Sequence, residues 1–378
     1  MSNPFTYGGI VTGKQFCNRT REIKELVRAV NNGEKLFIYG ERRIGKTSLL
    51  RKVAAQLEDD KTIAILINVW KCVDTMDFVN ICATEIAKAE GSAGVLKRIR
   101  RLFDGISPAV TIGDDGKPSL SFQRSAGRLS SDQLENVLKA TWKIADSNKD
   151  KRLLVVFDEF QQVRLLNDER IERLLRSVVQ ERSDIAWFFC GSREHLIKQM
   201  FLDSNSPLYR SAGHYPIETI ANEHWKEFIH NKFKSTGRDI PNAVILKLLD
   251  ITSGHPFYTQ LLCSSLWDLC EPDIEISIDI LDRALLVLLD RENSAYHARW
   301  DSLPEQSKRM LRAIAFENPL EAPYSGDILA QYGFTSPSSA GRAIEYLTSH
   351  DLIMKTSSGG YSIIDRFLGI WCRRNFSI

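Results

Sequence analysis

The chain has 378 residues, 26% charged and 43% hydrophobic, with a formal net charge of +2. These values are typical of a globular protein of two or three domains, and they exclude the chain-wide basic field that would demand nucleic acid. The sequence shows no apolar run long enough to cross a bilayer, no basic-then-apolar signal at its start and no C-x-x-C pair among its seven cysteines. We therefore expect reduced thiols, no membrane contact and a cytoplasmic location.

The first elements expected are a one-faced helix over residues 21–32 and a short buried strand over residues 36–39. Residues 40–47 then have the sequence Gly-Glu-Arg-Arg-Ile-Gly-Lys-Thr, which fits the phosphate-loop pattern G-x-x-x-x-G-K-[ST]. The alternative is an ordinary turn, but a strand, a glycine-rich loop and a helix in this order favour a phosphate loop. The apolar face of the helix that follows is formed by Leu49, Leu50, Val53, Ala54 and Leu57.

The residue types in this loop suit a nucleotide. Glycines let backbone N–H groups curl around the phosphates, at the positive end of the helix that begins here. Lys46 supplies a charge toward the β and γ phosphates, and the Thr47 hydroxyl is placed to hold Mg²⁺. We therefore predict that ATP and Mg²⁺ are bound here, and the nucleotide-binding residues expected in the loop are Gly40, Arg43, Ile44, Gly45, Lys46, Thr47 and Ser48.

A buried strand over residues 62–69 and a helix over residues 76–90 come next, and residues 91–130 then interrupt the alternation. Apolar segments around the Gly-Asp-Asp-Gly sequence at residues 113–116 predict a β-hairpin insertion. Its first half contains a basic cluster that is either a solvated helix face or a binding patch for DNA or an acidic partner. The cluster consists of Lys97, Arg98, Arg100 and Arg101.

A long helix leads to the next strand, the apolar run of residues 153–157, which ends in Asp158 and Glu159. Such a run is typical of a central parallel strand buried on both faces, and open α/β sheets bind ligands at the carboxyl ends of their strands. Asp158 would hold Mg²⁺ through water, and Glu159 would orient and deprotonate the attacking water. The alternative is a solvated acidic pair that caps the next element.

Another helix precedes a strand over residues 185–190, and residues 214–220 form the last strand expected in the sheet. Ser192, just after the first of these strands, either hydrogen-bonds the γ-phosphate or the attacking water, or simply turns the chain. Arg193 and Arg210 are either surface arginines or groups that stabilise transition-state charge, within the chain or from a neighbouring subunit.

Helical patterns fill residues 222–295, and the pattern from residue 303 is helix, helix, helix and wing. Ser336 and Pro337 predict the start of the third of these helices. Its exposed face is expected to contain only one cation, Arg342. The face is expected to consist of Ser338, Ser339, Arg342, Glu345 and Tyr346. Other cations nearby are Lys355 in the wing, and Arg373 and Arg374 near the C-terminus.

These pieces together resemble the archaeal-type ATPases of the STAND class (signal-transduction NTPases with numerous domains), relatives of the AAA+ replication-licensing ATPases. The resemblance covers nearly the whole chain, and six short motifs in the right order carry it. They are the N-terminal box (residues 3–5, 16–19 and Glu22), the phosphate loop (39–48), the acidic strand end (157–161), Gly191-Ser192, the arginine segment 206–210 and the lid motif 253–258.

The resemblance implies an α/β fold, with an AAA+/STAND-type parallel-sheet core (residues 1–220, the insertion 91–130 included), a helical lid (221–295) and a winged-helix domain (296–378). It implies that the N-terminal box packs beside the adenine and that Pro256 shapes the lid against the nucleotide. Two departures matter. Phe257 stands near where AAA+ machines place a lid arginine, which favours a switch over a motor. Tyr209 abuts Arg210 without the family's intervening glycine, so an arginine-finger role for Arg210 stays open.

The function expected is an ATPase of low turnover that acts as a two-state switch, with Lys46, Glu159, Ser192 and Arg210 as catalytic candidates and Thr47 and Asp158 as metal ligands. One alternative is a DNA-binding AAA+ loader or recruiter. Another is a non-hydrolysing nucleotide-binding regulatory subunit of a separate effector. A protein partner is expected, while DNA contact through the winged helix and a homo-oligomer stay open.

Overall fold

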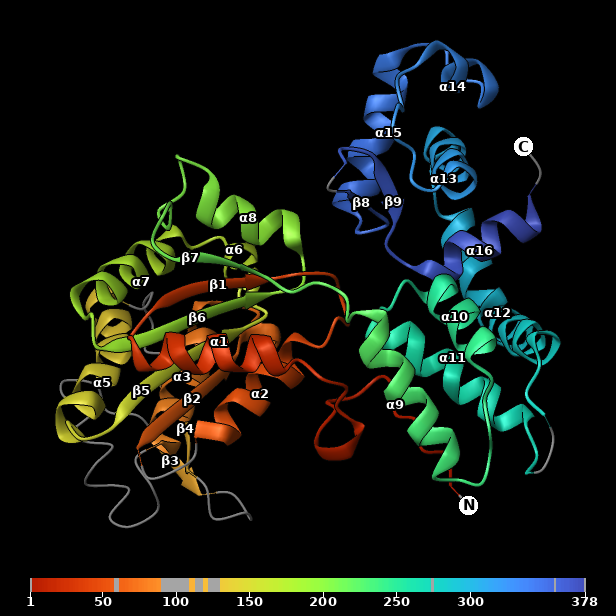
Figure 1. Ribbon diagram of the computed structural model, residues 1–378. Helices are drawn as coiled ribbons and strands as arrows, with labels where there is room; N and C mark the ends of the chain where they lie inside the picture. The colour runs from red at the N-terminus through yellow and green to blue at the C-terminus, as the bar shows by residue number, and fades with distance from the viewer. Residues whose placement is uncertain are drawn as a thin grey trace. The chain divides into compact units, whose positions relative to one another are not determined.

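The chain folds into two compact units (Figure 1). The sheet unit comprises Ile10–Gly13 and Asn18–Glu218, and the helical unit comprises Met1–Gly9, Lys14–Cys17 and Thr219–Ile378. The chain therefore passes between the units four times, after residues 9, 13, 17 and 218. This computed structural model describes residues 2–57, 61–89, 130–272, 275–356 and 358–376, and the backbone of 109–112 and 118–121.

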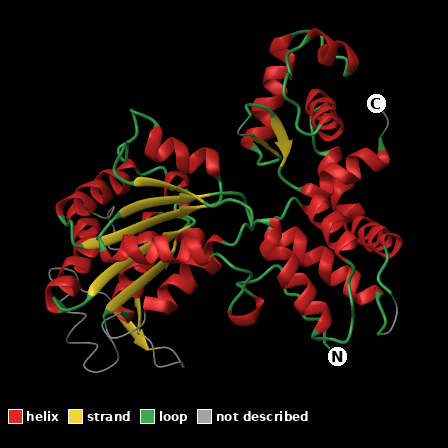
Figure 2. Ribbon diagram, in the orientation of Figure 1, coloured by secondary structure: helices red, strands yellow, loops and turns green. Residues whose placement is uncertain are grey.

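A five-stranded parallel sheet forms the centre of the sheet unit (Figure 2). Its strands, in spatial order, are β2 (Thr62–Asn68), β5 (Arg152–Asp158), β6 (Ile185–Gly191), β1 (Lys35–Tyr39) and β7 (Gly213–Pro216). The apolar runs predicted as buried strands all form strands, and all seven residues of β6 are buried. The burial predicted for residues 62–69 is wrong, because β2 is an edge strand in which only Ile65 and Ile67 are buried. Since the strands are parallel, their carboxyl ends meet at one edge, where Tyr39 pairs with Gly191 and Asn68 with Asp158.

Helices cover both faces of this sheet. One face packs against α3 (Thr75–Lys88), α5 (Ser131–Ser147), α7 (Glu169–Glu181) and α8 (Glu194–Leu202), around side chains such as Phe157 and Trp187. On the other face lie α1 (Thr20–Asn31) and α2 (Lys46–Leu57), which pack against each other. A short helix, α6 (Gln162–Leu165), follows β5. The alternation of side chains along each strand gives both helical layers an apolar surface to cover.

The last predicted strand is shorter than expected. β7 ends at Pro216, whereas the sequence predicts a strand over residues 214–220. The Ile217 N–H still bonds to the Tyr39 carbonyl at 2.7 Å, but the Ile220 N–H bonds to the Gly254 carbonyl of the helical unit instead. The chain has therefore left the sheet by Thr219, where the helical unit begins.

In the insertion, β3 (Ala109–Ile112) and β4 (Pro118–Ser121) pair antiparallel, as a hairpin requires. The turn between them and the basic cluster at residues 97–101 lie outside the described residues.

The helical unit contains α9 (Asn222–Lys234), α10 (Asn242–Thr252), α11 (Pro256–Leu269) and α12 (Ile278–Asp301). It continues with α13 (Glu305–Glu317), α14 (Gly326–Gln331), α15 (Pro337–Ser349), the antiparallel wing strands β8 (Ile353–Lys355) and β9 (Tyr361–Ile363), and α16 (Arg366–Asn375). The predicted winged helix is confirmed. Because α12 continues to Asp301, the predicted boundary at residue 295 falls inside a helix, and the domain limits stay predictions.

The start of α15 is as predicted, with Ser336 as N-cap and Pro337 at the first helical position. The prediction that Ser339 is exposed is wrong. Its side chain is buried, and its hydroxyl donates to the Ser336 carbonyl at 2.7 Å. A serine in the first turn can satisfy its hydroxyl on the cap backbone, which a helical-wheel argument does not foresee. In the described parts of the chain, no helix has the length and hydropathy needed for a membrane span.

Candidate functional site

The loop of residues 40–45 joins β1 to α2 at the carboxyl edge of the sheet. Gly40 needs to be glycine, because a Cβ atom there would lie 2.4 Å from the Ile217 carbonyl oxygen. Gly45 and Arg43 have φ values of 95° and 63°, in the left-handed region. The loop therefore curls back on itself immediately before the twelve-residue helix α2, whose first N–H groups have no partner within the helix.

Lys46 is almost fully buried, with 6% of its surface exposed. Its ammonium group donates to the carbonyls of Gly40 at 2.8 Å and Glu41 at 2.7 Å, so it spans the loop. Burial lowers the pKa of this amine, while the nearby Cys190, Glu159 and Asp158 act in the opposite direction.

Thr47 and Asp158, which are 111 positions apart in the sequence, meet at the strand ends. The Thr47 hydroxyl donates to the Asp158 carboxylate at 2.7 Å. Burial raises the pKa of Asp158, and the hydrogen bond from Thr47 partly offsets this effect. A hydroxyl and a carboxylate are the hard oxygen ligands that Mg²⁺ prefers, so the two residues fit the predicted metal.

Glu159 lies next to this pair, with a left-handed φ of 55°. One of its carboxylate oxygens, Oε2, accepts from the Ser192 hydroxyl at 2.8 Å and from the Gln161 amide at 2.5 Å. The structure thus brings Lys46, Thr47, Asp158, Glu159 and Ser192 together at one edge of the sheet.

The remaining predicted residues are placed as follows. Ile44 is buried, and the Ser48 hydroxyl accepts from the Val11 N–H at 3.0 Å. Arg43 and Arg210 are both exposed, and the Arg210 guanidinium lies 5.2 Å from the Tyr209 ring centre. Pro256 belongs to the helical unit, where it opens α11. The roles of Arg210 and Pro256 stay predictions.

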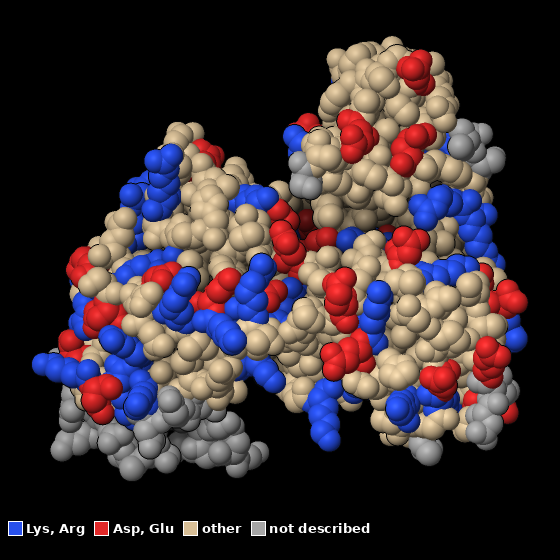
Figure 3. All heavy atoms as spheres, viewed as in Figure 1, with Lys and Arg blue, Asp and Glu red and all other residues tan. Residues whose placement is uncertain are grey.

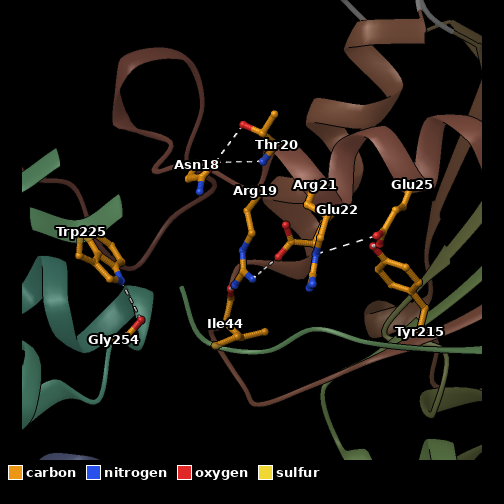
Figure 4. Close-up of polar contacts among 10 residues, drawn as sticks. All are labelled: Asn18, Arg19, Thr20, Arg21, Glu22, Glu25, Ile44, Tyr215, Trp225 and Gly254. Atoms are coloured by element: carbon orange, nitrogen blue, oxygen red, sulfur yellow. Dashed lines mark hydrogen bonds and ion pairs between the residues drawn. The ribbon is translucent and has the colours of Figure 1, made fainter. Parts of the chain in front are cut away.

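Two residues support the site through contacts that the sequence did not predict. Arg19 is buried, with 5% of its surface exposed, and its guanidinium donates to the Ile44 carbonyl of the loop at 3.3 Å and to Glu22 at 2.7 Å (Figure 4). Gln161 is 1% exposed and touches Glu159. Both lie within motifs on which the family resemblance rests, but only the folded structure shows what they contact.

A phosphate loop before a helix, at the same edge of a parallel sheet as a strand that ends in an acidic pair, defines a P-loop NTPase domain. The chain belongs to the family described as an ATPase domain predominantly from Archaea, whose model matches residues 16–262. Residues 294–374 match a family described as a probable winged helix domain.

The chain is similar to several known proteins. The uncharacterized protein MJECL04 of Methanocaldococcus jannaschii is 22% identical over 374 residues, which cover 96% of this chain and 69% of that protein. The Walker-type ATPase PABY2304 of Pyrococcus abyssi has a TM-score of 0.67 and 18% identity, covering 98% of this chain and 99% of that one. The Aeropyrum pernix ORC2 protein, solved as ADPNP–ADP complexes, has a TM-score of 0.51 and 16% identity, with 94% of each chain covered. These two structures share the fold.

Proposed function

We propose that the chain binds ATP with Mg²⁺ and hydrolyses it slowly, as a molecular switch. The observation that carries this proposal is the contact between Thr47 and Asp158 at 2.7 Å, directly beside a Glu159 carboxylate that Ser192 holds at 2.8 Å. A metal-binding pair next to an oriented carboxylate is the arrangement that phosphoryl transfer to water requires.

Each residue has a separate task in this mechanism. Thr47 and Asp158 would hold the magnesium ion, which supplies positive charge to the phosphate oxygens. Lys46 exchanges its bonds to the loop carbonyls for bonds to the β and γ phosphates. Glu159 takes a proton from water as the water oxygen bonds to the γ-phosphorus. The bond from the γ-phosphorus to the bridging oxygen breaks, and its electron pair leaves with ADP. Ser192 keeps the carboxylate in place.

The switch part of the proposal rests on the helical unit. Phe257, half-buried at the start of α11, stands near where AAA+ motors place an arginine, and its ring packs against Tyr258 with centroids 5.2 Å apart. A phenylalanine ring has no charge that could pair with the γ-phosphate, so a STAND-type switch is favoured over a processive motor.

Replacing Lys46 by alanine tests the central claim. We expect the fluorescence of an ATP analogue to show at least about a hundredfold weaker binding, because the phosphates lose their fixed charge partner. The matched control is Lys24→Ala, which removes an exposed lysine of α1 from the same unit. Equal affinity in Lys46→Ala and Lys24→Ala would overturn the proposal.

A further inference from the structure

Gln161 occupies an unusual position for a polar side chain. It is 1% exposed, and its amide nitrogen donates to Glu159 Oε2 at 2.5 Å, the same oxygen that accepts from Ser192. Its own carbonyl oxygen, Oε1, is buried without a hydrogen-bond donor among the described residues. A half-satisfied buried amide is a poor choice for stability, so packing alone does not account for glutamine here.

The neighbouring Gly191 provides the space for this amide. A Cβ atom on Gly191 would lie 2.5 Å from Gln161 Oε1 and 2.7 Å from the Ile197 Cδ1 atom. Gly191 has no positive φ, so its backbone does not require glycine. What requires glycine is the room taken by the Gln161 amide and by the Ile197 side chain, whose Cβ atom would lie 3.3 Å away.

The backbone around Gln161 is held firmly. The Phe160 N–H donates to the Cys190 carbonyl at 2.8 Å, and the Gln162 N–H donates to the Glu159 carbonyl at 2.9 Å. Phe160 is fully buried, and its ring packs on Phe157 and Phe189. The turn that follows β5 therefore fixes Gln161 against Glu159 and leaves the amide little freedom.

We infer that Gln161 is a positioning residue for ATP hydrolysis, and that Gly191 is glycine in order to admit it. This inference rests on the proposed function. Gln161 and Ser192 both donate hydrogen bonds to Oε2 of Glu159. Because both donors are on Oε2, Oε1 is the oxygen that takes the proton of the attacking water. As that proton moves, the water oxygen bonds to the γ-phosphorus and the bond to the bridging oxygen breaks, with its electron pair leaving on ADP.

The test uses Gln161→Met in the full chain, because methionine keeps the volume and removes the donor. We expect kcat to fall about tenfold or more, the scale of a weakened general base, with unchanged ATP affinity and an unchanged or higher Tm. The matched control is Gln162→Met, the half-buried neighbour, which should hydrolyse ATP at the wild-type rate. A wild-type rate in Gln161→Met, or equal losses of rate and ATP affinity, would overturn the inference.

A double-mutant cycle covers the case in which Gln161→Met does not fold. Gly191→Ala should lower kcat in the wild-type background, because the methyl group displaces the amide. The same Gly191→Ala change should lower kcat much less in a Gln161→Ala background, where the amide is absent and the flexible Ile197 tip can move. Additive losses would refute the link between the two residues. If the wild-type protein itself neither binds nor hydrolyses ATP, the proposed function is wrong, and the inference that rests on it is wrong as well.

Discussion

At the scale of single residues, Glu159 has a left-handed backbone and a carboxylate that accepts hydrogen bonds from Gln161 and Ser192. A left-handed conformation of a residue other than glycine costs about 1–3 kcal/mol and persists only where its surroundings enforce it. Here the hydrogen bond from Phe160 N–H to the Cys190 carbonyl and the two donors on Oε2 enforce it. Strain held at a strand end next to a phosphate loop is consistent with a chemical role for this residue.

We expect Glu159→Gln to keep ATP binding and to lower turnover by about a hundredfold, since an amide cannot accept the proton of water. Phosphate release measures the rate, and titration with an ATP analogue measures the affinity. Glu181→Gln, at the exposed end of α7, serves as the control and should leave both unchanged. Wild-type turnover in Glu159→Gln would mean that another group activates the water.

Single residues differ in how far the sequence could predict them. Lys46 and Thr47 follow from a local pattern, and Asp158 follows from an apolar strand that ends in a carboxylate. The contact between Thr47 and Asp158 joins distant parts of the chain, but the order of parallel strands makes it foreseeable. The contacts of Gln161 and Arg19 depend on which side chains meet in the folded core, and no local periodicity encodes that.

At the scale of elements, Asp168 joins two helices. Its carboxylate caps the start of α7, accepts from the Arg170 guanidinium at 2.7 and 2.8 Å, and accepts from the Thr75 hydroxyl of α3 at 2.9 Å. The hydrogen bonds from Arg170 lower the pKa of Asp168 to about 2. The folded state therefore binds the proton less tightly than the unfolded chain, whose aspartates titrate near about 3.9.

We expect Asp168→Asn to reduce the free energy of unfolding by about 1 kcal/mol at pH 7, because asparagine keeps the cap and loses the charge. The contribution is complete above about pH 5 and is lost as the pH falls toward 2, so the difference from wild type should shrink over that window. Urea unfolding at several pH values measures it. Glu169→Gln, whose ion pair with Arg173 is exposed, should show almost no difference at any pH.

Two of the four winged-helix cations named from the sequence have partners within the protein. The Arg373 guanidinium donates to the Ala315 carbonyl, and Arg374 pairs with Asp290, both at 2.7 Å. Arg342 and Lys355 are exposed on α15 and β8. On the face drawn in Figure 3, basic and acidic side chains are interspersed over both units.

We therefore expect weak DNA binding at most, with log K falling against log salt at a slope of about −1.8 for two phosphate contacts. Arg342→Ala should reduce that slope by about one unit, whereas Arg374→Ala should leave it unchanged. Fluorescence anisotropy with duplex DNA at several salt concentrations measures both. Tight sequence-specific binding at physiological salt would place the loader alternative first.

At the scale of the whole molecule, the switch proposal predicts that ATP changes the distance between the two units. All seven native cysteines are buried, so dyes can be attached to cysteines introduced at exposed Lys24 and Ser338, one in each unit. We expect energy transfer between them to differ between ATP and ADP in the Glu159→Gln background. Lys46→Ala should abolish the difference, and identical transfer with both nucleotides would argue against a switch.

The sequence predicted the sheet, the helical segment and the winged helix, because strand–loop–helix order and helix caps are local signals. It did not predict the end of β7 at Pro216. There the Ile220 N–H has two potential acceptors, a sheet strand or Gly254, and tertiary structure decides between them. The wrong exposure of Ser339 has a similar origin, since a local side-chain bond overrides the helical face.

The four passages between the units have a practical consequence for anyone cutting the gene into pieces. Phe5 and Cys17, 5% and 7% exposed, belong to the apolar core of the helical unit, and the Phe5 ring lies 5.2 Å from that of Phe233. A fragment that starts at residue 219 would lack both and would leave part of that core uncovered. A fragment of residues 18–218 would lose the Val11 bond to Ser48 beside the loop. Neither unit is a contiguous stretch of sequence, so recombinant fragments should retain the first seventeen residues or supply them as a separate peptide.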